Sequence, residues 1–148
     1  TGMTGHQDNP GTGFTAKGES TTLISIESLV KAIGIKHVYV IDPNNLALVD
    51  ETLDKCLALD EPSVIITRWP CVLKKFSQAD KEEFEGMFST KNKVDEEKCI
   101  GCKACLRTGC PALSFDKASK KVQISHAQCV GCDVCTQVCP KDAIVKED

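Results

Sequence analysis

The stretch Cys99-Ile-Gly-Cys102-Lys-Ala-Cys105 recurs later in the chain as Cys129-Val-Gly-Cys132-Asp-Val-Cys135. Each copy is followed by a Cys-Pro pair, at Cys110-Pro111 and at Cys139-Pro140. The second copy has the spacing C-x2-C-x2-C-x3-C-P, and the first carries one additional residue beside Gly109. The chain therefore contains an internal duplication, which holds all but two of its 10 cysteines. We call the spacing from Cys99 to Cys129 the repeat offset.

This cysteine spacing predicts iron–sulfur chemistry. Three cysteines separated by two residues form a tight loop that can hold three corners of a cubane, and the proline directs the fourth thiolate away. In two-cluster ferredoxins the fourth cysteine of such a run ligates the other cluster. We therefore predict two 4Fe-4S clusters. The expected ligands are Cys99, Cys102, Cys105 and Cys139 for cluster 1, and Cys129, Cys132, Cys135 and Cys110 for cluster 2.

Two other uses of clustered cysteines fit less well. Structural zinc takes four tetrahedral ligands, usually from two separated C-x2-C pairs, so the third closely spaced cysteine of each motif has no use there. A disulfide framework belongs to an oxidising compartment, and the start of the sequence carries no basic segment followed by an apolar one that would indicate secretion. The cluster interpretation is therefore favoured over zinc and over disulfides.

Composition limits the remaining possibilities. The 148 residues are 41% hydrophobic and 26% charged, which is typical of a folded globular chain. The formal net charge of -3 argues against a nucleic-acid partner, which normally meets a basic face. The sequence contains no apolar run of the roughly 18 residues that span a bilayer. We expect a cytoplasmic protein that binds neither nucleic acid nor membrane.

The first half of the chain predicts a parallel crossover unit. Ser25 precedes apolar residues at helical spacing over 26–33, and Gly34 follows as a stop signal. The run 37–41 is β-branched and aromatic, which predicts a buried strand, and 64–67 predicts a second strand. Between them, a helix is expected to begin near Asn44-Asn45. Its predicted apolar stripe comprises Leu46, Val49, Leu53, Cys56 and Leu57.

A crossover of two strands is too small to protect its sheet edges, so we expect the front of a larger α/β domain to be missing. The charged stretch 74–93 is interpreted as a linker with a short exposed helix at 79–87. Strand signals at 113–115, 122–124 and 143–145 complete a small α+β module around the cysteines. Clusters are expected to supply much of its folding free energy, because little apolar core is available.

The two ends of the chain together resemble one family. The opening TGMTGHQDNPGTG, residues 1–13, is similar to the stretch that follows the diphosphate–magnesium motif in thiamine-diphosphate-dependent 2-oxoacid:ferredoxin oxidoreductases. His6 and the PGTG continuation look most like the α subunit of the indolepyruvate type, which ends in a two-cluster ferredoxin domain. The resemblance covers nearly the whole chain, including CLRTGCPAL at 105–113 with its x4 spacing.

The resemblance implies the architecture of the chain. Residues 1–73 would be the C-terminal part of an α/β thiamine-diphosphate-binding domain built on the parallel crossover, 74–93 a charged linker, and 94–148 an α+β two-cluster ferredoxin-like domain. Thiamine diphosphate and magnesium would be bound only by the full-length protein, because a GDG-type motif is expected before Thr1 and does not occur in this sequence.

The resemblance also implies roles for the opening residues. Met3, Thr4, Gly5 and Gln7 would lie by the thiamine cofactor, and His6 would carry a proton or contact substrate, because an imidazole titrates near neutrality. The alternative for this stretch is a terminal tail without a site. Cys71 follows Trp69-Pro70 and is either near that site or a structural thiol.

The implied reaction is oxidative decarboxylation of a 2-oxoacid such as an arylpyruvate. Electrons would pass singly through the clusters to an external ferredoxin while coenzyme A takes the acyl group, in a complex with a smaller β subunit. The cofactor would supply the carbanion chemistry. The alternative is a two-cluster electron carrier whose first half is an α/β docking domain without catalysis. Sequence encoded upstream of Thr1 would distinguish the two.

We predict that anaerobically reconstituted protein contains about eight irons and about eight acid-labile sulfides per chain, because two 4Fe-4S clusters require that number. Metal and sulfide analysis of the purified protein measures both. A zinc content equal to or above the iron content would contradict the prediction.

Overall fold

The computed structural model describes residues 7–73, 78–83 and 90–147. The chain forms two compact units, residues 1–80 and 81–148, and each is described by itself.

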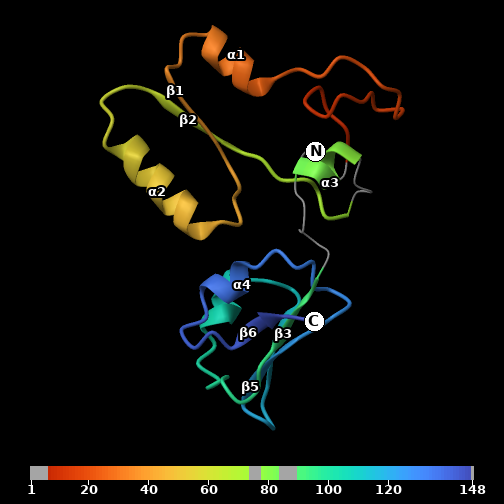
Figure 1. Ribbon diagram of the computed structural model, residues 1–148, viewed down its shortest axis with the longest axis vertical. Coiled ribbons are helices and arrows are strands. Elements are labelled where there is room, and N and C mark those ends of the chain that lie inside the picture. The colour runs from red at the N-terminus through yellow and green to blue at the C-terminus, as the bar shows by residue number, and fades with distance from the viewer. Residues whose placement is uncertain (1–6, 74–77, 84–89, 148) are drawn as a thin grey trace. The chain divides into compact units, whose positions relative to one another are not determined.

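Unit 1 contains the predicted crossover (Figure 1). Helix α1 (Ile26–Ala32) is capped by the Ser25 side chain and followed by Gly34 at φ 98°. Strand β1 (His37–Ile41), helix α2 (Leu46–Leu57) and strand β2 (Ser63–Thr67) follow. The two strands pair in parallel along their full length, with His37 opposite Ser63. The helix start near Asn45, whose side chain accepts the Leu48 N–H, and the parallel pairing are confirmed.

The burial of unit 1 differs from the prediction. Of strand β1, predicted to be buried, only Ile41 is buried, and the other four residues are partly exposed. On α2 the buried residue is Thr52, whose hydroxyl donates to the Leu48 carbonyl, whereas Leu57 of the predicted stripe is 81% exposed. Cys56, predicted to be core, is only partly buried. A two-stranded sheet is narrow, so it covers one side of the helix and leaves apolar surface open.

The linker region is described in part. Helix α3 (Gln78–Glu83) lies where a short helix was expected over 79–87, and residues 84–87 fall outside the described part of the chain.

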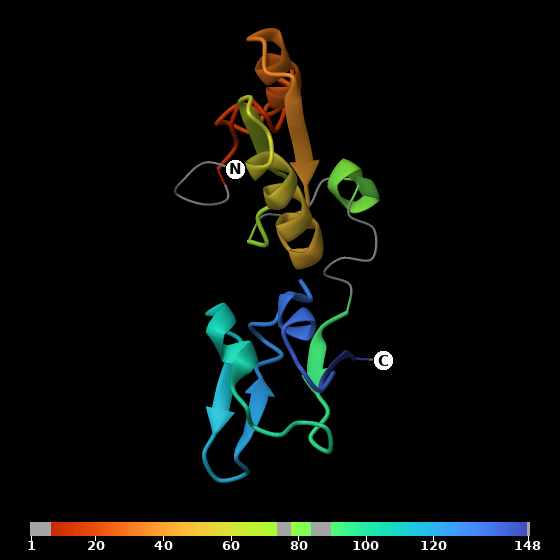
Figure 2. The same cartoon turned by 90° about the vertical axis from the view of Figure 1, so that its left-hand side faces the viewer.

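Unit 2 is built from two antiparallel strand pairs. Strands β4 (Leu113–Asp116) and β5 (Lys121–Ile124) form the hairpin drawn in cyan and blue in Figure 2. Strand β3 (Asn92–Val94) pairs with β6 (Ile144–Lys146). The short helices η1 (Ala104–Thr108), a 3-10 helix, and α4 (Val134–Gln137) each begin inside a cysteine motif.

Strand β3 corrects the sequence analysis, which assigned residues 92 and 93 to the linker and predicted no strand there. The duplication contains the missing signal. The repeat offset carries Asn92–Val94 onto residues 122–124, which were predicted as a strand and lie in β5. Asn and Lys are poor strand formers, so composition alone hid this equivalence.

The strand pairing exchanges partners between the two copies. β3 leads into the first motif and pairs with β6, which follows the second, and β5 leads into the second motif and pairs with β4, which follows the first. Equivalent main-chain hydrogen bonds extend the exchange: Asp95 N–H donates to the Ala143 carbonyl at 2.7 Å, and Ser125 N–H donates to the Ala112 carbonyl at 2.8 Å. Each copy is therefore completed by the other.

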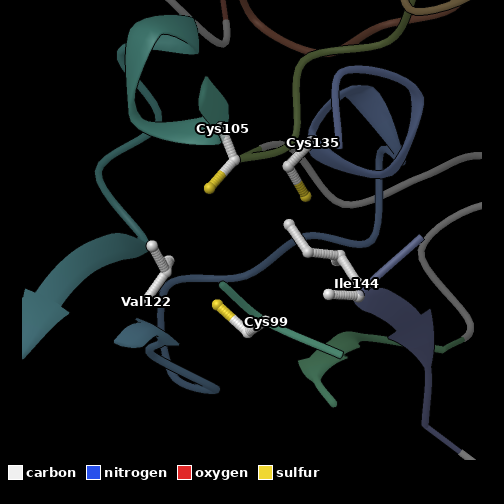
Figure 3. Close-up of a cluster of buried hydrophobic side chains, with 6 residues drawn as sticks. Cys99, Cys105, Val122, Cys135 and Ile144 are labelled. Atoms are coloured by element: carbon white, nitrogen blue, oxygen red, sulfur yellow. The ribbon is translucent and has the colours of Figure 1, made fainter. Parts of the chain in front are cut away.

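The core of unit 2 is made largely of thiols. Its buried side chains are those of Cys99, Cys105, Val122, Cys135, Ala143 and Ile144. Figure 3 shows the sulfur atoms of the three cysteines lying toward the same interior as the Val122 and Ile144 side chains. A core so poor in large apolar residues gains little from hydrophobic burial, so its stability depends on what the thiols bind.

Gly101 and Gly131 are required by close backbone packing between the copies. Their φ angles are 68° and 71°. A Cβ on Gly101 would overlap the carbonyl oxygen of Lys120, and a Cβ on Gly131 would overlap that of Thr90. Thr90 and Lys120 are themselves separated by the repeat offset, so both contacts obey the same internal symmetry.

We predict that Gly101→Ala destabilises the cluster-loaded protein more than Gly109→Ala does, by about 1–3 kcal/mol, the usual cost of overpacking. Gly109 is the matched control, since its φ of 70° imposes the same backbone strain while nothing lies within 4 Å of an added Cβ. Denaturant unfolding followed by cluster absorbance measures the difference. Equal losses for the two variants would show that only the backbone conformation matters.

Candidate iron–sulfur sites

The two cysteine loops have the same backbone conformation. Each contains two residues in the left-handed region, Gly101 and Lys103 in the first and Gly131 and Asp133 in the second, all with φ between 62° and 71°. The first cysteine of each loop is tied by an equivalent bond: Cys99 N–H donates to the Asp95 carbonyl at 3.0 Å. In the second loop Cys129 N–H donates to the Ser125 carbonyl at 2.9 Å. The repeated spacing thus produces a repeated loop whose third cysteine, Cys105 or Cys135, is buried, whereas Cys102 of the first loop is exposed.

The first set of predicted ligands lines a single cavity. Its wall includes the thiols of Cys99, Cys102, Cys105 and Cys139. Apolar side chains, among them Val94, Val122 and Ile144, complete much of the wall. Burial raises the pKa of the Cys105 thiol, and the proximity of the Cys139, Cys102 and Cys99 thiols raises it further. The fourth thiol of this set comes from the second motif.

The thiols of the second set also lie close to one another. Burial raises the pKa of the Cys135 thiol to about 11, with further contributions from Cys132, Cys110 and Cys129. Cys110 belongs to the first motif, so the exchange is reciprocal. Without a cluster both buried thiols are protonated at neutral pH, and ligation must displace those protons.

Backbone donors point at the sulfurs. Ala143 N–H donates to the Cys139 sulfur at 3.3 Å, and Asn92 N–H donates to the Cys129 sulfur at 3.5 Å. Such bonds stabilise negative charge on a ligating thiolate and help to set the potential of a bound cluster. Grouped soft donors with an N–H donor at one sulfur of each set, and an apolar wall around the first set, fit 4Fe-4S clusters.

Positive side chains accompany the first set. Lys103 and Lys141 line its cavity, and the Lys103 ammonium lies 4.1 Å from the centroid of the Phe115 ring. The Lys121 ammonium donates to the carbonyl of Cys99 and, at 2.9 Å, to that of Glu96. A cluster bound by four thiolates is negative, so these cations offset part of its charge.

Over the described residues, no three His, Cys, Asp or Glu side chains converge closely enough to hold a single metal ion. A four-iron cluster is larger than one ion, so its ligands need only surround a common space.

The residues predicted to contact thiamine diphosphate or substrate lie in the opening stretch of the chain. Met3, Thr4, Gly5 and His6 lie outside the described residues, and Gln7 is exposed. Cys71 is partly buried. Within the part of the chain that the structure describes, no helix combines the length and the apolar character needed to cross a bilayer.

Comparison with a known family supports this description of unit 2. Residues 76–143 match the model of a family described as a 4Fe-4S dicluster domain. Among solved structures, ferredoxin I from Desulfovibrio africanus is 24% identical, with a TM-score of 0.36, and the match covers 40% of this chain and 98% of that one.

Curated relatives match both units. "Indolepyruvate oxidoreductase subunit IorA" of Thermococcus kodakarensis is 42% identical over 144 residues, which cover 97% of this chain. The proteins of the same name from Archaeoglobus fulgidus and Methanothermobacter marburgensis are 42% and 34% identical over 97% and 99% of the chain. The chain spans 22% of the length of each of these relatives.

The match over residues 76–143 makes unit 2 similar to 4Fe-4S dicluster domains. Over nearly its whole length the chain is similar to part of the proteins named indolepyruvate oxidoreductase subunit IorA, which confirms the resemblance stated from the sequence.

Residues that sequence reasoning missed lie outside the motifs. Asn92 contributes a main-chain donor to Cys129 and a side-chain contact to Cys135, and Ala143 contributes a donor to Cys139. The duplication could have identified Asn92, because the repeat offset relates it to Val122 in the predicted strand that leads into the second motif.

We predict that Cys139→Ala damages the cluster held by Cys99, Cys102 and Cys105, because Cys139 lies with those thiols. The cluster of its own motif should keep its paramagnetic-resonance signal. Cys110→Ala is the matched variant, with the opposite cluster affected. Loss of the Cys129–Cys135 cluster in the Cys139 variant would contradict the exchanged ligation.

Proposed function

We propose that this chain is the electron-transfer part of a 2-oxoacid:ferredoxin oxidoreductase of the indolepyruvate type. The observation that carries the proposal is similarity across both units at once, since the IorA alignments extend over 97–99% of the chain. The two-cluster motif alone would be generic to electron carriers. Its combination with the α/β unit in one alignment is what favours an enzyme subunit.

In this proposal Cys99, Cys102, Cys105 and Cys139 hold cluster 1, and Cys129, Cys132, Cys135 and Cys110 hold cluster 2. A bound cluster accepts and releases one electron at a time. Apolar side chains form much of the wall around the first thiol set, and the N–H groups of Ala143 and Asn92 stabilise sulfur charge. Lys103 and Lys141 reduce the electrostatic penalty of adding an electron.

Unit 1 is proposed to be a piece of a larger thiamine-diphosphate-binding domain, with residues 1–73 as its C-terminal part and 74–93 as the linker to the ferredoxin domain at 94–148. Because β3 pairs with β6 from Asn92 onward, the ferredoxin domain is proposed to begin at Asn92. Exposed apolar side chains support this proposal. Leu29 is 56%, Ile33 72% and Leu57 81% exposed. Helix α1 has no buried residue, as expected for an element that packs on structure outside the chain.

The remaining roles follow from the family resemblance. Met3, Thr4, Gly5 and Gln7 are proposed to contact thiamine diphosphate in the full-length protein, where magnesium anchors the diphosphate, and His6 to carry a proton or touch substrate. The proposed partners are the smaller β subunit, a 2-oxoacid such as indolepyruvate, coenzyme A and an external ferredoxin. The proposed location is the cytoplasm.

We predict that the 148-residue chain, loaded with clusters, accepts and donates electrons but does not decarboxylate arylpyruvates when thiamine diphosphate, magnesium and coenzyme A are supplied. Electron transfer needs only the cysteine ligands, all of which are present. The carbanion chemistry needs a cofactor anchor that the resemblance places before Thr1. Dithionite reduction followed by transfer to an oxidised ferredoxin, and assay of carbon dioxide release, measure the two activities.

The full-length polypeptide with the β subunit should reduce ferredoxin in an arylpyruvate-dependent way. Variants in which Cys102→Ala or Cys132→Ala removes one ligand should lose ferredoxin reduction in that complex, because the electron path is broken. Turnover by the isolated chain would contradict the proposed division. Failure of the full complex with every 2-oxoacid would favour an electron carrier with a docking domain.

A further inference from the structure

The duplication gives each position around one thiol set a counterpart around the other, so the two environments can be compared residue by residue. The three closely spaced cysteines and the loop glycine are the same in both copies. One buried pair differs: through the repeat offset, Asn92 in β3 corresponds to Val122 in β5. Both are almost fully buried, with 2% and 3% of their surface exposed. One set of thiols thus has a carboxamide at the position where the other has an isopropyl group.

The Asn92 carboxamide is directed at the second thiol set. Its Nδ2 donates to Asp133 Oδ1 at 2.9 Å and lies 4.0 Å from the Cys135 sulfur. Its Oδ1 is buried and has no hydrogen-bond partner in the described structure. The Asp133 carboxylate accepts only from N–H, which fixes the amide orientation and places the donor, rather than the oxygen, beside the sulfur.

Asp133 is itself the counterpart of Lys103, so the two loops carry opposite charges at one position. The Lys146 ammonium lies 2.9 Å from Asp133 Oδ2 and also donates to the Gly131 carbonyl at 3.1 Å. Asn92 and Lys146 therefore hold one carboxylate from its two oxygens. The negative charge of the Asp133 carboxylate near Cys135 is therefore paired with an N–H donor and with an ammonium group.

We propose that the Asn92 side chain is a positioning residue that raises the reduction potential of the cluster held by Cys129, Cys132, Cys135 and Cys110, and that Val122 leaves its partner cluster without this effect. The inference rests on the proposed ligation. Reduction adds negative charge to cluster and sulfurs, so an N–H donor beside Cys135 stabilises the reduced form more than the oxidised form. By engaging the Asp133 carboxylate, the same amide limits the opposing effect of that charge.

Replacing the amide tests this directly. In the cluster-loaded chain, Asn92→Val converts the position to its counterpart and keeps the main-chain N–H that reaches Cys129. Redox titration monitored by paramagnetic resonance should show a negative shift of the midpoint potential of cluster 2 and no shift for cluster 1. Cys132→Ser, which alters one ligand of cluster 2, identifies its signal. Asn92→Gln, which retains a carboxamide, should recover part of the shift.

The reciprocal variant provides the matched control. Val122→Asn introduces a buried carboxamide beside the first thiol set and should raise the midpoint potential of cluster 1 while leaving cluster 2 unchanged. Equal shifts of both clusters in Asn92→Val would indicate a general structural effect and overturn the inference. An unchanged cluster 2 potential in a fully loaded variant would overturn it as well.

The unaltered protein supplies a measurement that depends on no variant. With 15N-labelled asparagine, the Asn92 carboxamide protons should show hyperfine-shifted NMR resonances that change on reduction of cluster 2. Absence of such a shift in loaded protein would overturn the inference. Failure of the wild-type chain to load two clusters at all would instead contradict the proposed function.

Discussion

Unit 2 depends on one constraint: each set of four thiols takes three members from one cysteine motif and the fourth from the other. A fourth thiol can reach the opposite loop only if the chain after each motif returns to the other half. The pairing of β3 with β6 and of β4 with β5 performs that return. The hydrogen bonds from Asp95 to Ala143 and from Ser125 to Ala112 continue it beyond the strands. Neither half can therefore be completed without its partner.

The exchange has an energetic consequence. Thiols make up three of the six buried residues in the hydrophobic cluster of unit 2, and burial raises the pKa of two of them, Cys105 and Cys135. Thiolate formation in that interior is unfavourable unless iron compensates it, so cluster assembly and folding are coupled. Unit 1 depends on apolar burial instead. Its helices and strands carry apolar side chains, many still exposed, whose natural complement is further protein surface.

The internal duplication also distinguishes features that both cysteine loops need from side chains that differ between the two copies. The positive-φ glycines, the loop hydrogen bonds and the carbonyl contacts at Lys120 and Thr90 occur twice, because any copy of the loop needs them. The Asn92/Val122 and Asp133/Lys103 pairs differ between copies, although Asn92 and Val122 both lie in strands and Asp133 and Lys103 share a left-handed backbone conformation. Differences confined to side chains around a common backbone change the electrostatics of each thiol set rather than its shape.

Short-range patterns in the sequence were enough for several elements. The Ser25 and Asn45 caps, the helix between two strands and the three thiols that each motif gives to one set depend on spacing between near neighbours, which the sequence displays directly. Tertiary structure alone decided that Thr52 rather than Leu53 or Leu57 is buried, that Gly101 packs on the Lys120 carbonyl, and that Asn92 lies beside Cys135. Asn92 and Cys135 are far apart in the sequence, and only the exchanged strand pairing brings their atoms together.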